Sequence, residues 1–188
     1  MIVLAALAVV LVSVVLARGS LAAVVSIRLR ALWMVATAIA LQIAVINVFE
    51  HALPHAVAAW AHVVSYALAA AFLFANRRIS GLWVVALGAA LNVAPIVANG
   101  GVMPASPSAY ARAGRAVATE KFVNSAATAD ARLAALGDIF AVPAGYPLAN
   151  VFSIGDVVLV VGAGVVLHRA TGSRLAGRRY RIGVVTTG

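Results

Sequence analysis

The sequence contains no cysteine and very few acidic residues. The absence of cysteine among the 188 residues excludes disulfides, thiolate catalysis and cysteine-ligated metal or haem sites. Only 10% of the residues are charged, and Asp and Glu together number 5. A soluble domain of this size carries far more charge than that. The low charge therefore points away from a soluble protein.

Apolar residues, by contrast, make up 64% of the chain and give it a mean hydropathy of +1.06. They are gathered in long runs, which is typical of a polytopic membrane protein. The sequence predicts an all-α membrane protein with a single domain over residues 1–188. Five transmembrane helices are expected, at about 1–17, 31–49, 56–75, 81–97 and 151–168.

The basic residues indicate the orientation of these spans. The net charge is +9, but the arginines stand at the ends of apolar runs, which favours a role in membrane topology over nucleic-acid binding. With an uncleaved first helix and the N-terminus outside, the short arginine-bearing connections and the basic tail 169–188 lie inside. The long loop 99–150 then lies outside. We expect a multi-pass cell-membrane protein with an inner C-terminus, whose partners are membrane lipid and other membrane-protein subunits.

The outer loop is the only long polar segment of the chain. Helical spacing of apolar residues predicts two short interfacial helices in it, Ala109 to Val123 and Thr128 to Leu136, with Gly137 as a helix stop. Pro143 and Pro147 mark irregular chain that returns to the membrane.

Two aspartates flank the end of this loop. Asp156 falls about one turn inside the fifth predicted helix, where an ionisable side chain is costly and therefore a candidate functional residue. If Asp138 folds back against it, the two carboxylates would share a proton and activate water as acid and base. The alternative is structural: Asp138 turns a loop, while Asp156 accepts hydrogen bonds from backbone N–H groups at the helix start.

Two motifs resemble those of the lipoprotein signal peptidases (signal peptidase II). Phe152-Ser153-Ile154-Gly155-Asp156 is similar to the Phe-Asn-x-Ala-Asp motif of that family, and Asn99-Gly100-Gly101-Val102-Met103 to its Asn-x-Gly-Ala-Ala-Phe motif. The resemblance implies that Asp156 and Asp138 are the catalytic aspartates. Asp138 departs from the family's Gly-Asn-x-x-Asp-Arg motif, because Ala135 and Ile139 replace its Asn and Arg.

A second resemblance covers more of the chain. Asn99-Gly100-Gly101-x-Met103-Pro104, Leu136-Gly137-Asp138-Ile139 and Ser153-Ile154-Gly155-Asp156 occur in this order, as in a group of small bacterial integral-membrane proteins of unknown function. This resemblance implies the fold and topology but no activity.

Amide side chains form another candidate site. Asn92 and Asn99 are seven residues apart on the fourth predicted helix, and Gln42 and Asn47 lie on the second. With the aspartates and Ser153 they would line a polar pocket that opens outward. The alternative is that each amide bonds a neighbouring helix. Asn99-Gly100-Gly101 either presents backbone N–H groups to a ligand or forms a tight helix end.

A metal site is the weaker alternative at the outer face. Glu50, His51, His55 and His62 lie near the start of the third predicted helix, where two or three of them would meet a metal ion. Pro54 interrupts the spacing between His51 and His55, and hydrogen bonds from interfacial histidines to loops explain the same residues. No cofactor is predicted.

Two functions of different class follow. One is a non-enzymatic accessory subunit, or a binder of lipid or a small ligand, organised on the outer loop. The other is a membrane-embedded aspartyl hydrolase that uses Asp138 and Asp156, with Asn99 positioning the substrate.

Overall fold

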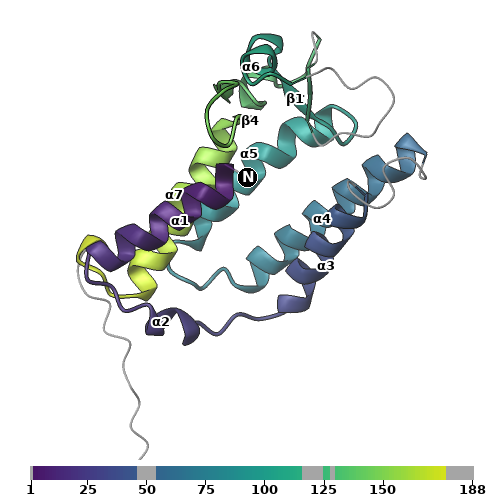
Figure 1. Cartoon of the computed structure of the whole chain (residues 1–188). Helices are drawn as coiled ribbons and strands as arrows, with labels where there is room; N and C mark the ends of the chain where they lie inside the picture. The colour runs from purple at the N-terminus through teal and green to yellow at the C-terminus, as the bar shows by residue number, and fades with distance from the viewer. Residues whose placement is uncertain (1, 46–53, 116–124, 128–129, 177–188) are drawn as a thin grey trace, which may run out of the picture.

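The protein is mostly helical in the computed structural model, which describes residues 2–45, 54–115, 125–127 and 130–176 (Figure 1). The α-helices are α1 (Ile2–Leu16), α2 (Ala22–Val25), α3 (Leu32–Ile43), α4 (His55–Ala75), α5 (Leu82–Ala98), α6 (Pro107–Arg112) and α7 (Ile154–Ala170). The strands are β1 (Met103–Ala105), β2 (Ser125–Ala127), β3 (Phe140–Val142) and β4 (Asn150–Phe152).

The long helices form two groups. In Figure 1, α1 and α5 lie along α7, whereas α3 and α4 form a separate antiparallel pair. The most extensive helix packing in the described chain is between α5 and α7, and the packing between α3 and α4 comes next. Contacts between α4 and α5, which join the two groups, are sparse.

Glycines allow α5 and α7 to approach closely. A Cβ atom added at Gly88 would lie 2.6 Å from the backbone N of Leu159, and one at Gly162 would lie 2.6 Å from the backbone N of Val85. Only glycine fits where two helix backbones come so near, as in small-residue interfaces between membrane helices. These positions explain why α5 and α7 form the tightest pair.

The ends of the long helices meet at two faces of the bundle. We call one of these faces the arginine end, because arginines flank the helices there. They are Arg18, Arg28, Arg30, Arg77, Arg78, Arg169 and Arg174. The Asn76 side chain bonds the backbone N–H and C=O of Arg30 there, and Arg169 donates to Ser80 Oγ over 3.0 Å. His168 on α7 bonds Ser13 Oγ on α1 over 3.1 Å. The direction of the chain thus alternates from α1 through α3, α4, α5 and α7 (Figure 1).

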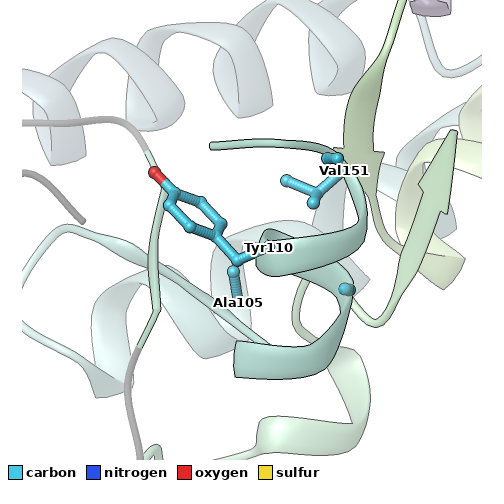
Figure 2. Packing of buried hydrophobic residues seen from close by; sticks show 5 residues of the cluster. Ala105, Tyr110 and Val151 are labelled. Carbon is cyan, nitrogen blue, oxygen red and sulfur yellow. The ribbon is translucent and has the colours of Figure 1, made fainter. Parts of the chain in front are cut away.

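The opposite end carries a small folded cap, defined as residues 99–115, 125–127 and 130–153. Its sheets are a parallel pair, β1 with β2, and an antiparallel pair, β3 with β4. Phe140 and Phe152 stack across the second pair, with ring centroids 5.3 Å apart. Figure 2 shows the apolar core of the cap, in which the buried Tyr110 ring lies near Ala105 and Val151.

The cap corrects the prediction of two interfacial helices. In the described part of the first of these, residues 109–115, helix α6 ends at Arg112, and Gly114 adopts a left-handed φ of 66° just after it. Residues 116–123 of the predicted helix lie outside the described chain. In the described part of the second, residues 130–136, Leu133 has a φ of 54° and only Ala134–Leu136 is helical, as one 3-10 turn. The strands also show that the cap is not all-α.

One described helix is long and apolar enough to cross a membrane. Ala56–Ala75 has a mean hydropathy of 1.8, whereas Ile2–Leu16, Leu32–Ile43 and Leu82–Ala98 are apolar but shorter. The helices match the five predicted runs in position. Residues 46–49, expected to complete the second span, lie outside the described chain, and five spans stay a prediction.

Candidate functional site

Asp156 closes a capping box at the start of α7. Its carboxylate accepts a hydrogen bond from the backbone N–H of Ser153 over 3.0 Å, and its own N–H donates to Ser153 Oγ over 3.0 Å. Such reciprocal bonds satisfy N–H groups that a helix start otherwise leaves unpaired, and the helix dipole favours the carboxylate. Asp156 therefore has the geometry expected of the structural alternative.

Asn92 extends this cap onto the neighbouring helix. Its amide nitrogen donates to Asp156 Oδ1 over 2.8 Å, while its oxygen accepts from Ser153 Oγ over 2.7 Å. The Ser153 side chain is 0% exposed. Both Asp156 oxygens thus have donors, and the three side chains form one closed network that joins α5 to the beginning of α7.

Asp138 belongs to the cap and not to this network. Its N–H donates to the carbonyl of Pro104 over 2.8 Å, and its carbonyl accepts from the N–H of Ser106 over 3.0 Å. These bonds add the Asp138 segment to β1 on the side away from β2. Asp138 as a whole residue is 7% exposed. Its carboxylate accepts from Ser125 Oγ over 2.6 Å, so the side chain also reaches the start of β2.

Burial raises the pKa of the Asp138 carboxyl to about 6. The Ser125 hydrogen bond opposes this rise, the charge of Asp156 adds to it, and the charge of Arg115 opposes it. The carboxyl therefore holds its proton more readily than an exposed aspartate does.

The charge of Asp156 acts on Asp138 through space, and the described chain shows no direct hydrogen bond between the two carboxylates. Each has its own donors: Ser125 for Asp138, and Asn92 with Ser153 for Asp156. The shared proton expected for an aspartyl dyad requires the two groups in contact. The hydrogen bonds present are those of a cap joined to a helix start.

Asn99-Gly100-Gly101 forms the tight end of α5. Gly100 and Gly101 have φ values of 69° and 95°, and the Gly101 N–H returns to the carbonyl of Ile96 over 2.8 Å. This is the glycine helix end that positive φ permits. The Asn99 side chain bonds both the N–H and the C=O of Arg132, which attaches the cap to α5.

The three described amides of the expected polar pocket lie apart from one another. Gln42 donates to Ser65 Oγ on α4 over 2.9 Å, Asn92 bonds Asp156 and Ser153, and Asn99 bonds the cap backbone. These three amides thus lie in separate contacts. Gln42 and Asn92 each bond a neighbouring helix, which is the structural alternative, whereas Asn99 bonds the cap. Asn47 lies outside the described residues.

The histidine and acidic cluster gives no metal site within the described part of the chain, where no group of three or more metal-binding side chains occurs. His62 is buried and its Nδ1 bonds the carbonyl of Gly101 over 2.7 Å, which ties α4 to the end of α5. Glu50, His51 and the side chain of His55 lie outside the described residues, so the other members of the proposed site stay a prediction.

Two contacts that hold the structure together were not singled out in the sequence. Ser125 lies in a polar stretch without a local motif, and its partner Asp138 is 13 residues away. Asn76 directly precedes a pair of arginines, and this sequence is typical of an ordinary helix end. Both side chains act through partners distant in sequence, which local spacing does not reveal.

Comparison with known families agrees with the broader of the two resemblances. The profile of a family of unknown function, DUF5317, matches residues 26–168. The chain belongs to this family. No curated protein and no solved structure matches it. The likeness to signal peptidase II therefore rests on two short motifs, and the DUF5317 match covers α3 to α7 and the cap.

Proposed function

We propose that this DUF5317 protein is a five-span, single-domain membrane protein that acts as a non-enzymatic lipid-binding or accessory subunit. Four features support membrane insertion: one helix of spanning length, three shorter apolar helices, alternating helix directions, and an arginine end that holds most of the described arginines, whereas the cap holds Arg112, Arg115 and Arg132. Apolar side chains also point outward from the bundle, among them Val9, Trp60, Phe74, Trp83 and Val161. Lipid would cover such a surface.

The observation that carries the non-enzymatic role is that each carboxylate oxygen of Asp156 accepts a hydrogen bond from a structural partner. A carboxylate that serves as a general base must reach the proton it abstracts. Asp156 instead accepts from Asn92 and from the Ser153 N–H. In this proposal Asp156, Asn92, Ser153 and Asn99 attach the outer cap to the bundle.

The absence of cysteine makes the topology directly testable. Single cysteines at Ser108 in the cap and at Ser80 at the arginine end can be labelled in intact cells with a membrane-impermeant maleimide. We expect labelling at position 108 only, and labelling at position 80 after the cells are permeabilised. Labelling of both positions in intact cells, or the reverse pattern, would contradict the proposed orientation.

The aspartyl hydrolase is the second candidate, and one observation favours it: buried Asp138 has a raised pKa and lies in the field of Asp156. Perturbed carboxyls of this kind occur at catalytic sites. The test is incubation of the purified protein with a synthetic lipid-modified signal peptide, the substrate class that the resemblance to signal peptidase II implies. We expect no cleavage. Cleavage that is lost in both Asp138→Asn and Asp156→Asn would replace the non-enzymatic proposal with the hydrolase.

A further inference from the structure

A groove separates the two helix groups. It has a volume of about 540 Å³ and lies between α4 and α5, from Val63 and Val93 to Arg77. At the cap end the helix groups meet again, where Gly101 packs on Ala59 and bonds His62. At the arginine end the short connection from Asn76 to Gly81 joins α4 to α5.

Alanines create the groove. One face of α4 contributes Ala67 and Ala70, and one face of α5 contributes Ala86 and Ala90. Three of these, Ala67, Ala70 and Ala90, are exposed although they face the other helix. Larger side chains at these positions would fill the space, as side chains do in a close-packed helix pair.

The groove has a cation at one end only. Arg77 lines the mouth at the arginine end, and its guanidinium lies 4.2 Å from the centroid of the Phe74 ring. Its Nη1 also donates to the Phe74 carbonyl over 3.1 Å. These contacts hold the charge at the mouth while the side chain stays exposed. Phe74 and Trp83, both exposed, flank the same mouth.

The shape and charge match one phospholipid chain with its headgroup. From Val63 to Arg77 the helix rises by about 21 Å at about 1.5 Å per residue, which exceeds half of a hydrocarbon core of about 30 Å. Arginine binds phosphate oxygens through several N–H donors in a fixed fork. An apolar groove that ends at an arginine is therefore complementary to an acyl chain that ends at an anionic phosphate.

A whole helix does not match the groove. A helix about 10 Å across and about 20 Å long occupies roughly 1,600 Å³, about three times the volume of the groove. The volume instead falls within the range of small-ligand sites, about 300–1,000 Å³. The size favours a single acyl chain over a whole helix as the resident, and the single cation favours an anionic headgroup.

We propose that the groove between α4 and α5 binds one acyl chain of an anionic phospholipid from the inner leaflet, with its phosphate on Arg77. This assignment rests on the proposed membrane insertion and names the ligand of the proposed lipid-binding role.

Native mass spectrometry of the full chain, purified from membranes in mild detergent, tests the proposal with added phosphatidylglycerol and phosphatidylcholine. We expect one retained phosphatidylglycerol per chain, in preference to phosphatidylcholine. Loss of a charge-assisted hydrogen bond weakens binding on the order of tenfold, so Arg77→Gln should reduce retention by about that factor. Arg78→Gln is the matched control, because Arg78 is the neighbouring exposed arginine and does not line the groove.

A second pair of variants tests the location. Ala70→Leu combined with Ala90→Leu fills the groove and should abolish retention, whereas Ala71→Leu, on exposed α4 surface outside the groove, should not. Equal retention of the two lipids, equal effects of Arg77→Gln and Arg78→Gln, or retention by the filled variant would each overturn the assignment. Detection of a dimer of the chain without bound lipid would also overturn the assignment.

Resistance of each variant to carbonate extraction separates the two proposals. If the unmodified chain is extracted from membranes by carbonate, the proposed membrane protein is wrong. If it remains in the membrane but shows no preference for phosphatidylglycerol, only the groove assignment is wrong.

Discussion

The side-chain amide of Asn92 on α5 donates to the carboxylate of Asp156 on α7 over a distance of 2.8 Å. This bond links the tightest helix pair to the capping box at the point where the cap enters α7. Because Asn92 also accepts from Ser153, one amide serves two partners. The stability of the helix pair and that of the cap junction should therefore depend on the same side chain.

Asn92→Leu removes both hydrogen bonds and leaves two polar groups in a largely apolar surrounding. An unmade bond to a buried polar group costs about 1–3 kcal/mol, so we expect a loss of that order in the free energy of unfolding. The measurement is unfolding of the purified protein in detergent. Val97→Ala, at an exposed position on the same helix, is the control. Equal stability of the two variants would contradict a role of Asn92 in holding the network.

The sequence predicted the long helices well, because each is an apolar run bounded by polar or glycine residues. The structural alternative offered for Asp156 agrees with the capping box that the structure shows at Ser153-Ile154-Gly155-Asp156. The link to Asn92 was not predictable from spacing, because 64 residues separate the partners.

The cap was predicted poorly for a physical reason. Each of its strands has three residues, too few for an alternating pattern to appear. Their pairing depends on contacts between distant segments, such as Met103 with Ser125. The apolar spacing around Tyr110 instead suggested a longer helix, although that ring is buried in the core of the cap (Figure 2).

Gly162 and Gly164 on α7 should respond differently to substitution by alanine. A Cβ at Gly162 would lie 2.6 Å from the backbone N of Val85, whereas the nearest atom to a Cβ at Gly164 is a Val10 side-chain carbon at 3.7 Å. Overpacking costs about 1–3 kcal/mol, and alanine is favoured over glycine in a helix by about 1 kcal/mol. Thermal unfolding in detergent should show Gly162→Ala destabilised and Gly164→Ala unchanged or stabilised. Equal effects would contradict the close approach of α5 and α7.

Asn76 holds α3 against α4 at the arginine end. Its side chain is 3% exposed and makes two hydrogen bonds to the Arg30 backbone and one to the Phe72 carbonyl. Asn76→Ala leaves the Arg30 groups without this partner, and we expect a loss of about 1–3 kcal/mol in the free energy of unfolding. Arg78→Ala, at an exposed site two residues away, should have little effect. A comparison of the two unfolding curves checks the prediction. Equal free energies of unfolding for the two variants would contradict it.

Asp138 should make the stability of the cap depend on pH. Its pKa is raised from 3.8 to about 6, so between these values the folded state binds more protons than the unfolded state. The free energy of unfolding then falls as the pH rises through this interval, by up to about 3 kcal/mol at about 1.4 kcal/mol per pKa unit, and levels off above it.

Hydrogen exchange of cap amides from pH 4 to 7 measures this fall. Asp138→Asn should abolish it, because an amide accepts from Ser125 without titrating, whereas Asp130→Asn, at an exposed site, should retain it. A pH dependence that persists in Asp138→Asn would assign the titration to another group.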